Sequence, residues 1–282
     1  MGQTNKLIAL LKKIYKKTVS FKLLDKIVKK TIEGLVETFV QLKRFYFPKK
    51  FPWDWKLDML IENYEKNTVN YFKNNIKPGM TVADVGAHVG YYTVIFSRLV
   101  GPTGKVLAFE PDKENFSLLE KNTSRLKNVE RYENAISDKN GSVDFFKVIG
   151  STGCHSVVTP HAESEKESVQ SITLDSFVEK NTIKKIDFLK IDIEGAEPLA
   201  LKGMQKLIGN SENISIVSEL NPDSLAQLGE TPDSFFNGIA EQKLKVYKIG
   251  KNGNITEINK NDMANLEMYQ AKKLYTNILL KK

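Results

Sequence analysis

The chain has 282 residues, of which 41% are hydrophobic and 27% are charged, which are ordinary proportions for a folded globular protein. Its length favours one large domain, or a domain with an appendage, and excludes disorder as the default. No uninterrupted apolar run is long enough to span a membrane, and the N-terminal segment lacks the features of a secretory signal. The single cysteine, Cys154, excludes an internal disulfide, so we expect a cytoplasmic protein.

The net charge of +8 is concentrated at the N-terminal end. Residues 1–56 hold 14 Lys and Arg against 4 Asp and Glu, a local charge of +10, whereas residues 57–282 hold 28 against 30, a charge of −2. Because this body is slightly acidic, DNA is not an expected partner. The basic end could bind phosphate or anionic lipid.

Residues 1–50 form an amphipathic, basic arm that we expect to be helical. Its apolar residues recur mostly three and four apart, with lysines between them. One interpretation is a peripheral helix on an anionic membrane surface, formed by residues 1–46 and followed by interfacial aromatic residues. The other is a helix that packs on its own domain or on a second subunit, which would fit a homodimer. The prolines of "FPKKFPWDW" separate this arm from a body at 51–282.

Within the body, short apolar strands alternate with helix-length segments. After a helical period over 56–76, strands are expected at "TVADV", "KVLAFE", "VERYENAI", "IDFLKIDI" and "ISIVSEL", with helices at 91–100, 113–126 and 198–208. This alternation predicts an α/β fold in which helices cover both faces of a parallel sheet. Residues 141–177 interrupt it with two strands around a polar loop, which we interpret as a lid-like insertion or as a surface flap without a chemical role.

The stretch "VADVGAHVGYY", residues 82–92, is a glycine-bent turn between a strand and a helix. A dinucleotide fingerprint needs a second glycine where His88 stands, and the Gly-Lys-Ser/Thr end of a P-loop is missing. Asp84 precedes the bend, and Glu110 ends the next strand, where a carboxylate can accept hydrogen bonds from ribose hydroxyls. A ligand with an amino group and a ribose but no phosphate fits this set, and S-adenosyl-L-methionine is the favoured one.

The predicted cofactor-binding residues come from the ends of three successive strands. The third strand end, in "ENAIS", would place an adenine ring against its small and apolar side chains. The complete predicted set is Asp84, Gly86, Ala87, His88, Gly90, Glu110, Pro111, Asn134, Ala135 and Ile136.

The blocks "VADVGAHVGYYT", "GKVLAFEPDKENFSLLEKN", "ENAISD", "ITLDSF", "IDFLKIDIEGAEPLALKGM" and "ISIVSEL" resemble the FkbM family of S-adenosylmethionine-dependent methyltransferases. The likeness covers about residues 62–220. It implies a Rossmann-like, seven-stranded class I methyltransferase sheet and O-methylation, often of sugars or natural-product hydroxyls. The chain departs from the family at His88, where asparagine is usual, and residues 1–50 lie outside the resemblance.

The segment "KIDIEGAE" holds the candidate catalytic residues. Methyl transfer to a hydroxyl depends on positioning and on a group that accepts the hydroxyl proton. In a strand, Lys190, Asp192 and Glu194 share one face, and charges in a buried strand are costly without a role. We interpret Asp192 as a proton acceptor or substrate ligand held by Lys190, with Glu194 as a further candidate. Alternatively, Lys190 and Asp192 are a structural pair, and Glu194 or Glu197 caps the next helix.

Other residues could contribute to the same site. Glu219 ends the adjacent strand, and with Asp192 and Glu194 it could bind a divalent cation, although no ligand-spacing motif supports a metal. His155 or His161 in the polar loop could be a base or an ordinary loop residue. Cys154 needs no nucleophilic role, because methyl transfer requires no nucleophile from the enzyme.

The sequence therefore predicts a methyltransferase that uses S-adenosyl-L-methionine to methylate a hydroxyl of a sugar, glycan or natural-product-like acceptor. An RNA 2′-O-methyltransferase is the first alternative, because Lys190, Asp192 and Glu219 could activate a ribose hydroxyl beside a basic arm. A methyltransferase fold used as a non-catalytic binding module is the second.

Overall fold

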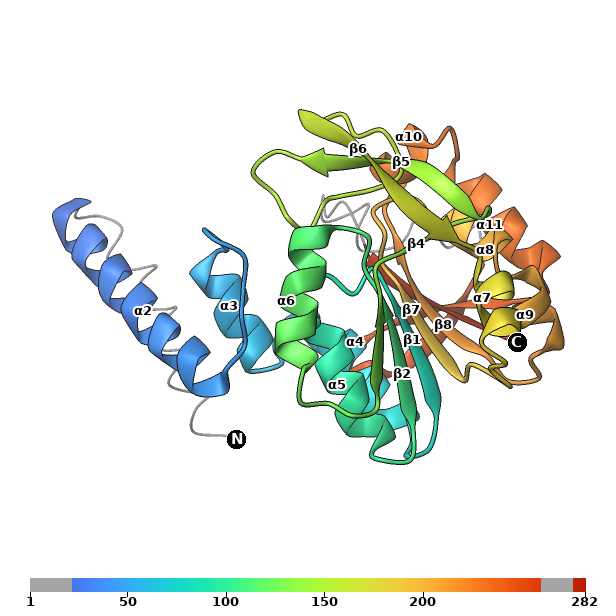
Figure 1. Cartoon of the computed structure of the whole chain (residues 1–282), viewed down its shortest axis with the longest axis horizontal. Helices are drawn as coiled ribbons and strands as arrows, with labels where there is room; N and C mark the ends of the chain where they lie inside the picture. The colour runs from blue at the N-terminus through green and yellow to red at the C-terminus, as the bar shows by residue number, and fades with distance from the viewer. Residues whose placement is uncertain (1–21, 260–275) are drawn as a thin grey trace. The chain divides into compact units, whose positions relative to one another are not determined.

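A computed structural model describes residues 22–259 and 276–282, with side chains from residue 27 onward (Figure 1). The first half of the predicted arm lies outside the described residues. The chain divides into two compact units, Met1–Lys66 and Asn67–Lys282. Each unit is described by itself.

The N-terminal unit contains the helices α2 (Lys22–Lys43) and α3 (Trp53–Leu60), and α2 confirms the helical prediction for this part of the arm. One face of α2 packs on α3, with Ile32, Val36 and Leu57 forming the buried centre of the contact. None of the described helices combines the length and the apolar character needed to cross a membrane.

The single helix expected over 56–76 is wrong. The chain instead forms α3 and then α4 (Lys66–Asn75). Between them, Glu62 has a φ of 57° and Glu65 a φ of 45°. Both angles lie in the left-handed region, which a right-handed helix cannot contain.

The second unit is built on an eight-stranded sheet of order β10-β9-β11-β8-β7-β1-β2-β3. The strands are β1 (Thr81–Val85), β2 (Lys105–Phe109), β3 (Val129–Tyr132), β7 (Phe188–Ile191), β8 (Ser215–Leu220), β9 (Lys245–Ile249), β10 (Ile255–Ile258) and β11 (Thr276–Lys281). The run from β3 to β8 is parallel, and β11 is antiparallel to both β8 and β9. The Rossmann-like class is confirmed, but the sheet has eight strands instead of seven because β10 turns back on β9 after the short helix η1 (Lys251–Gly253).

Helices cover both faces of this sheet (Figure 1). On one face lie α4, α5 (Tyr91–Val100) and α6 (Lys113–Thr123), and on the other α7 (Leu174–Lys180), α8 (Glu197–Lys202), α9 (Gln205–Asn210) and α11 (Pro232–Glu241), while α10 (Pro222–Gln227) follows β8. The prediction of a helix at 91–100 is confirmed, and the helix expected to reach 126 ends at Thr123.

The single helix expected at 198–208 is wrong, because the chain breaks into α8 and α9 at Gly203. A Cβ at Gly203 would lie 2.0 Å from the carbonyl oxygen of Ser137. The segment therefore passes close to another backbone at this point, which only glycine permits.

The alternation of side chains along β1 and β7 separates core from site. Ala83 and Leu189 face the main hydrophobic core, which also contains side chains of α7, α8, α9 and α11. Asp84 and Lys190 are register partners on the adjacent strands and project to the opposite face, toward α5. Two ionisable side chains thus lie beneath the carboxyl end of the sheet.

A second, three-stranded sheet of order β4-β6-β5 contains β4 (Ala135–Ile136), β5 (Gly141–Val148) and β6 (Ser164–Ile172). The two strands predicted within 141–177 are confirmed as the antiparallel pair β5 and β6. The single strand expected at "VERYENAI" is wrong, because β3 ends at Tyr132 and the chain then leaves the main sheet to pair Ala135 with Ser171 of β6.

Candidate active site

The turn after β1 is fixed by a close approach to the end of β7. Gly86 has a φ of 81°, and a Cβ on this residue would lie 1.9 Å from the carbonyl oxygen of Asp192. The N–H groups of Gly86 and Ala87 donate to the carbonyl oxygen of Phe109 at 3.0 and 2.9 Å. Because these donors are already used by β2, the turn lacks the row of open N–H groups with which a phosphate-binding loop holds its ligand.

His88 occupies the left-handed region, with a φ of 50°. Histidine and asparagine both enter this region more readily than most residues, which explains how His88 can stand where the FkbM pattern has asparagine. Its N–H donates to Glu110 Oε2 at 2.8 Å, and its Nε2 lies 3.2 Å from Thr152 Oγ1. Burial lowers the pKa of His88 to about 4, so the ring is neutral near pH 7.

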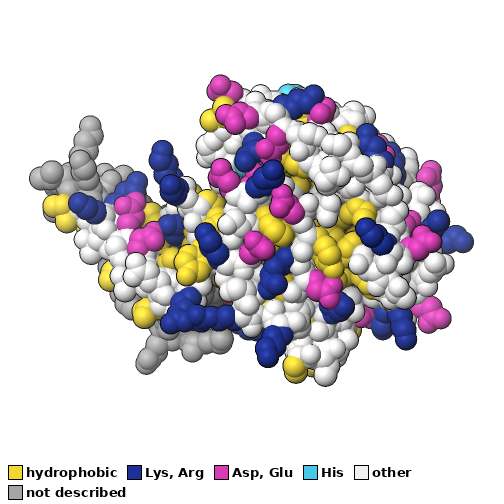
Figure 2. All heavy atoms as spheres, in the orientation of Figure 1, with side chains coloured by type: hydrophobic (Ala, Val, Ile, Leu, Met, Phe, Trp, Pro, Cys, Tyr) yellow, Lys and Arg dark blue, Asp and Glu magenta, His cyan; other side chains and the backbone are white. Residues whose placement is uncertain are grey.

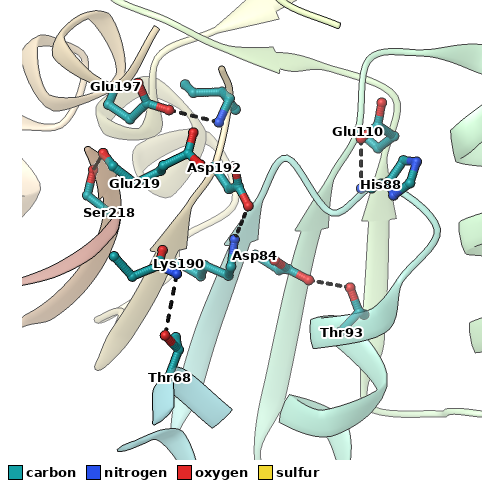
Figure 3. A network of polar contacts seen from close by, with 12 residues as sticks. Thr68, Asp84, His88, Thr93, Glu110, Lys190, Asp192, Glu197, Ser218 and Glu219 are labelled. Atoms are coloured by element: carbon teal, nitrogen blue, oxygen red, sulfur yellow. Dashed lines mark hydrogen bonds and ion pairs between the residues drawn. The ribbon is translucent and has the colours of Figure 1, made fainter. Parts of the chain in front are cut away.

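Asp84 is a buried carboxylate, with 1% of its surface exposed. Its Oδ2 accepts a hydrogen bond from Thr93 Oγ1 at 2.5 Å, whereas its Oδ1 has no hydrogen-bond partner among the described residues (Figure 3). Burial raises the pKa of Asp84 to about 6, although the nearby charge of Lys190 opposes that shift. A cationic amino group would supply the missing partner of Oδ1.

Glu110 joins the ends of β1 and β2. Its Oε2 accepts the N–H of His88, and its Oε1 accepts the N–H of Asp112 at 3.0 Å. Burial raises the pKa of Glu110 to about 7. Each carboxylate oxygen can accept a second hydrogen bond, so Glu110 can hold the turn and still bind hydroxyl groups.

The remaining predicted cofactor residues lie around this turn and in β4. Pro111 and Asn134 are partly buried. Ala135 belongs to the small core of the second sheet, and Ile136 to the main core. A contact between these residues and an adenine ring stays a prediction.

Lys190 and Asp192 form an ion pair at the end of β7, with 2.6 Å between Nζ and Oδ2 (Figure 3). The two side chains differ in exposure, at 1% for Lys190 and 29% for Asp192. The ammonium group of Lys190 also lies 4.6 Å from the centre of the Tyr92 ring, a cation–π contact. Lys190 thus holds the more accessible carboxylate from within the protein.

Two further carboxylates, those of Glu194 and Glu219, lie close to the Asp192 side of this ion pair. One oxygen each of Asp192, Glu194 and Glu219 lies within 4.8 Å of the others. Burial, and then repulsion by Asp192, raises the pKa of Glu194 to about 8. The charges meet at the carboxyl end of the sheet as expected. The prediction that Lys190, Asp192 and Glu194 share one face of a strand is wrong, because β7 ends at Ile191 and Glu194 has a φ of 54°. A metal ion between the carboxylates stays a prediction.

Glu197 stands at the start of α8, but its side chain bonds to the loop before the helix and is not the helix cap considered from the sequence. Its Oε1 accepts the N–H of Ile193 at 3.0 Å, across the turn that leads into α8. Burial raises its pKa to about 7. Glu197 shapes the loop after Asp192.

The loop between β5 and β6 contacts the site at two points besides His88. The Thr152 carbonyl accepts a hydrogen bond from Asn115 Nδ2 at 3.0 Å, and Ser156 Oγ donates to the Ile193 carbonyl at 3.1 Å. His155 Nδ1 accepts the N–H of Val148 at 3.0 Å, which leaves only Nε2 for another contact. His161 and Cys154 are exposed on the same loop.

Four residues that contact the site were not predicted from the sequence: Tyr92, Thr93, Asp112 and Thr152. The helical period of residues 91–100 could have placed Tyr92 and Thr93 against the strands, because both stand in its first turn. Asp112 caps α6 by accepting the N–H of Asn115 at 2.8 Å, and it pairs with Lys147 at 2.7 Å. The partners of Lys147 and Thr152 are distant in sequence, so no local pattern indicates them.

One known protein family matches the chain over most of this fold. The family described as the methyltransferase FkbM domain matches residues 84–244, which include the β1 turn, Glu110, Lys190 and Asp192. The chain belongs to the FkbM methyltransferase family. The FkbM methyltransferases use S-adenosyl-L-methionine, so the cofactor predicted from the turn agrees with the family.

Two curated relatives share part of the FkbM domain. Hexuronic acid methyltransferase AglP of Haloferax volcanii is 31% identical over 138 residues, which are 48% of this chain and 53% of the relative. The 2-O-methyltransferase NoeI of Sinorhizobium fredii is 28% identical over 142 residues, 45% of this chain and 58% of the relative. The chain thus spans about half the length of the curated relatives it matches. Among solved structures, the methyltransferase FkbM from Methylobacillus flagellatus aligns over 91% of this chain and 60% of its own, with 14% identity and a TM-score of 0.45.

The residues around the turn fit S-adenosyl-L-methionine. Within the part of the chain that the structure describes, one buried acceptor oxygen of Asp84 has no partner, which suits the amino group of the methionine part. Glu110 retains acceptor capacity for the two ribose hydroxyls. The N–H groups of Gly86 and Ala87 are bonded to Phe109, which agrees with a ligand that has no phosphate.

Proposed function

We propose that this protein is an S-adenosylmethionine-dependent O-methyltransferase that methylates a hydroxyl group of a sugar or glycan. The observation that carries the proposal is the Lys190–Asp192 pair, which places an accessible carboxylate at the end of β7, directly beside the β1 turn. A non-catalytic binding module is disfavoured, because the chain belongs to a family of methyltransferases. It also has the glycine-bent turn after β1 and a proton acceptor beside it.

Asp84 and Glu110 would hold the methionine part and the ribose of the cofactor, respectively. When it is bound, S-adenosyl-L-methionine supplies an electrophilic methyl group. Asp84 binds the amino group through Oδ1, while Thr93 fixes the orientation of the carboxylate through Oδ2. Glu110 accepts the ribose hydroxyls, and Gly86 brings the turn into contact with the backbone of Asp192.

Asp192 acts on the acceptor. A neutral alcohol is a poor nucleophile, so a positioned carboxylate that removes its proton accelerates the transfer. Lys190 fixes the rotamer of Asp192 through their 2.6 Å contact, and Tyr92 in turn lies against the ammonium group. Glu194 and Glu219 lie within reach of the same hydroxyl-bearing ligand.

Three neighbouring carboxylates suit an acceptor that carries several hydroxyl donors. Sugars have this chemistry, and the names of AglP and NoeI, a hexuronic acid methyltransferase and a 2-O-methyltransferase, support a sugar hydroxyl. A uronate carboxylate facing this cluster would be repelled by it. We therefore favour a sugar that presents neutral hydroxyls to Asp192.

The test is a transfer screen with S-adenosyl-L-methionine labelled in its methyl group. The full chain and the Asp192→Asn variant are incubated with glycan, lipid and RNA fractions of a cell extract. The proposal expects label in the glycan fraction, or in the sugar part of a glycolipid, with the wild-type chain alone. Label confined to ribose hydroxyls of RNA would replace the proposal with the RNA alternative.

A further inference from the structure

Large apolar side chains are exposed on the N-terminal unit. Among the described residues, seven large hydrophobic side chains are exposed, and five of these belong to this unit. They are Ile27 at 61%, Leu35 at 58%, Leu42 at 77%, Tyr46 at 50% and Trp55 at 44%. A patch of exposed apolar side chains marks an interaction surface, so the arrangement of these side chains on the unit is informative.

Three of these side chains follow one line along α2. Ile27, Thr31, Leu35, Thr38 and Leu42 are spaced four, four, three and four residues apart, the spacing of one helical face. We call these five residues the α2 stripe. It is distinct from the face of α2 that packs on α3, whose buried members are Ile32 and Val36.

The two threonines do not interrupt the apolar character of the α2 stripe. Thr31 Oγ1 donates to the carbonyl oxygen of Ile27, and Thr38 Oγ1 donates to that of Gly34, both at 2.9 Å. Their hydroxyl hydrogens are therefore satisfied within the helix, which leaves the methyl groups to join the leucines. The α2 stripe can leave water without stranding a donor.

The unit that carries the α2 stripe also exposes basic side chains. They are Lys29, Lys30, Lys43, Arg44, Lys49 and Lys50. Figure 2 shows dark blue basic and yellow hydrophobic side chains next to one another on this unit. Of the nearby acidic groups, Glu37 is paired with Lys56. These cations contribute part of the charge of +10 over residues 1–56.

We propose that the α2 stripe, with Tyr46 and Trp55, binds the surface of an anionic lipid bilayer. Leucine and isoleucine enter the boundary of the acyl chains, tyrosine and tryptophan favour the headgroup level, and lysines bind lipid phosphate. A second copy of the chain fits less well, because two such basic segments would repel each other. This surface would hold the methyltransferase domain at a membrane without spanning it.

The experiment is sedimentation of the full chain with two kinds of vesicle, phosphatidylcholine alone and phosphatidylcholine mixed with phosphatidylglycerol. We expect binding to the mixed vesicles at low salt and weaker binding as salt rises, because screening weakens attraction to the charged surface. Absence of binding to the mixed vesicles at low salt overturns the proposal.

Two variants with matched controls locate the surface. Leu35→Ser with Leu42→Ser should lower the affinity about tenfold or more, because both side chains lose their apolar contact with lipid. Ile149→Ser with Ile255→Ser removes two exposed apolar side chains of the other unit and should leave binding unchanged. Equal losses in both double variants would contradict the assignment.

The contribution of charge is tested separately with the double variant Lys29→Gln and Lys30→Gln. The control is the double variant Lys121→Gln and Lys180→Gln, which removes two exposed helical lysines of the other unit. Only the first pair should weaken binding, by about tenfold, since each lysine near an anionic surface adds to the attraction. Analytical ultracentrifugation without lipid tests the alternative that a second copy of the chain binds the α2 stripe. A concentration-dependent dimer that Leu35→Ser with Leu42→Ser dissociates would assign the α2 stripe to a second copy and overturn the lipid proposal.

Discussion

Asp192 follows Lys190 by two residues, just past the end of β7, yet Lys190 is enclosed by protein whereas Asp192 is partly exposed. Asp84, the residue proposed to bind the cofactor, is the register partner of Lys190 on β1. Lys190 therefore stands between the carboxylate assigned to the cofactor and the carboxylate assigned to the acceptor. A buried cation in this position needs both negative charges to offset its desolvation.

Asp192→Asn should abolish most turnover and leave cofactor binding nearly unchanged. The amide cannot accept the proton of the acceptor hydroxyl, and loss of a general base typically lowers the rate by about 10²–10⁴-fold. Single-turnover kinetics and calorimetry with S-adenosyl-L-methionine measure the two effects. Asp144→Asn, at an exposed ion pair with Lys166, is the control. Undiminished turnover in Asp192→Asn would remove the proposed role.

Lys190→Met should lower turnover about as strongly, and Lys190→Arg should recover part of it. Methionine keeps the length of the side chain but leaves Asp192 without its 2.6 Å partner. Arginine restores a cation, although its planar group fits a lysine site imperfectly. If Lys190→Arg is no better than Lys190→Met while both variants stay folded by circular dichroism, Lys190 is not an electrostatic positioning residue.

Cofactor affinity should rise with pH. The pKa values of Asp84 and Glu110 are raised by burial to about 6 and about 7, so both carboxyls lose charge in mild acid. The ionised forms are the ones that bind an amino group and accept two hydroxyl groups. Calorimetry between about pH 5.5 and 8 should show affinity falling toward acid, and Glu110→Gln should flatten that slope. A flat profile in the wild-type chain would contradict this use of the two carboxylates.

Gly86→Ala should destabilise the domain more than an alanine at an open helical glycine. The added Cβ would meet the carbonyl oxygen of Asp192 at 1.9 Å, on a residue with a φ of 81°. A cost on the order of 3 kcal/mol is expected for such a clash, or a fall in melting temperature of roughly 6 °C or more. Gly238→Ala in α11 has no atom within 4 Å and should be neutral or slightly stabilising.

The apo protein should become less stable as pH rises from about 5 to 8.5. Burial raises the pKa of Glu110 and Glu197 from 4.5 to about 7, and that of Glu194 to about 8. The folded state therefore binds protons more tightly than the unfolded chain, so this stabilisation is complete below pH 4.5 and is lost through pH 7 to 8. Thermal melts should show the decline, and Glu197→Gln should reduce it, whereas exposed Glu257→Gln should not.

The parallel strands and the charged cluster at their ends could be predicted from the sequence. "TVADV" and "KVLAFE" read as buried strands because their apolar runs are short and bounded by turn residues, and β1 and β2 lie there. Asp192, Glu194 and Glu219 could be brought together because parallel strands end at one edge. These inferences rest on local periodicity and on a general rule of sheet topology.

Breaks caused by distant backbone contacts could not be predicted in this way. The division between α8 and α9 at Gly203 depends on the carbonyl of Ser137, and the departure of Ala135 from the main sheet depends on Ser171 of β6. The sequence predicts Glu110 as a ribose ligand because it stands at the end of a strand. Its bonds to the N–H groups of His88 and Asp112 became visible only in three dimensions.

Transfer of a labelled methyl group from S-adenosyl-L-methionine to defined sugars, with the wild-type chain and Asp192→Asn side by side, tests whether Asp192 activates a sugar hydroxyl for methylation. A panel of neutral sugars and uronic acids, alone and in glycans, is followed by mass spectrometry and by mild alkali treatment, which hydrolyses methyl esters but not methyl ethers. We expect an alkali-stable methyl ether on a neutral sugar hydroxyl, formed by the wild-type chain and nearly lost in Asp192→Asn. An alkali-labile ester, or equal transfer by the two proteins, would contradict it.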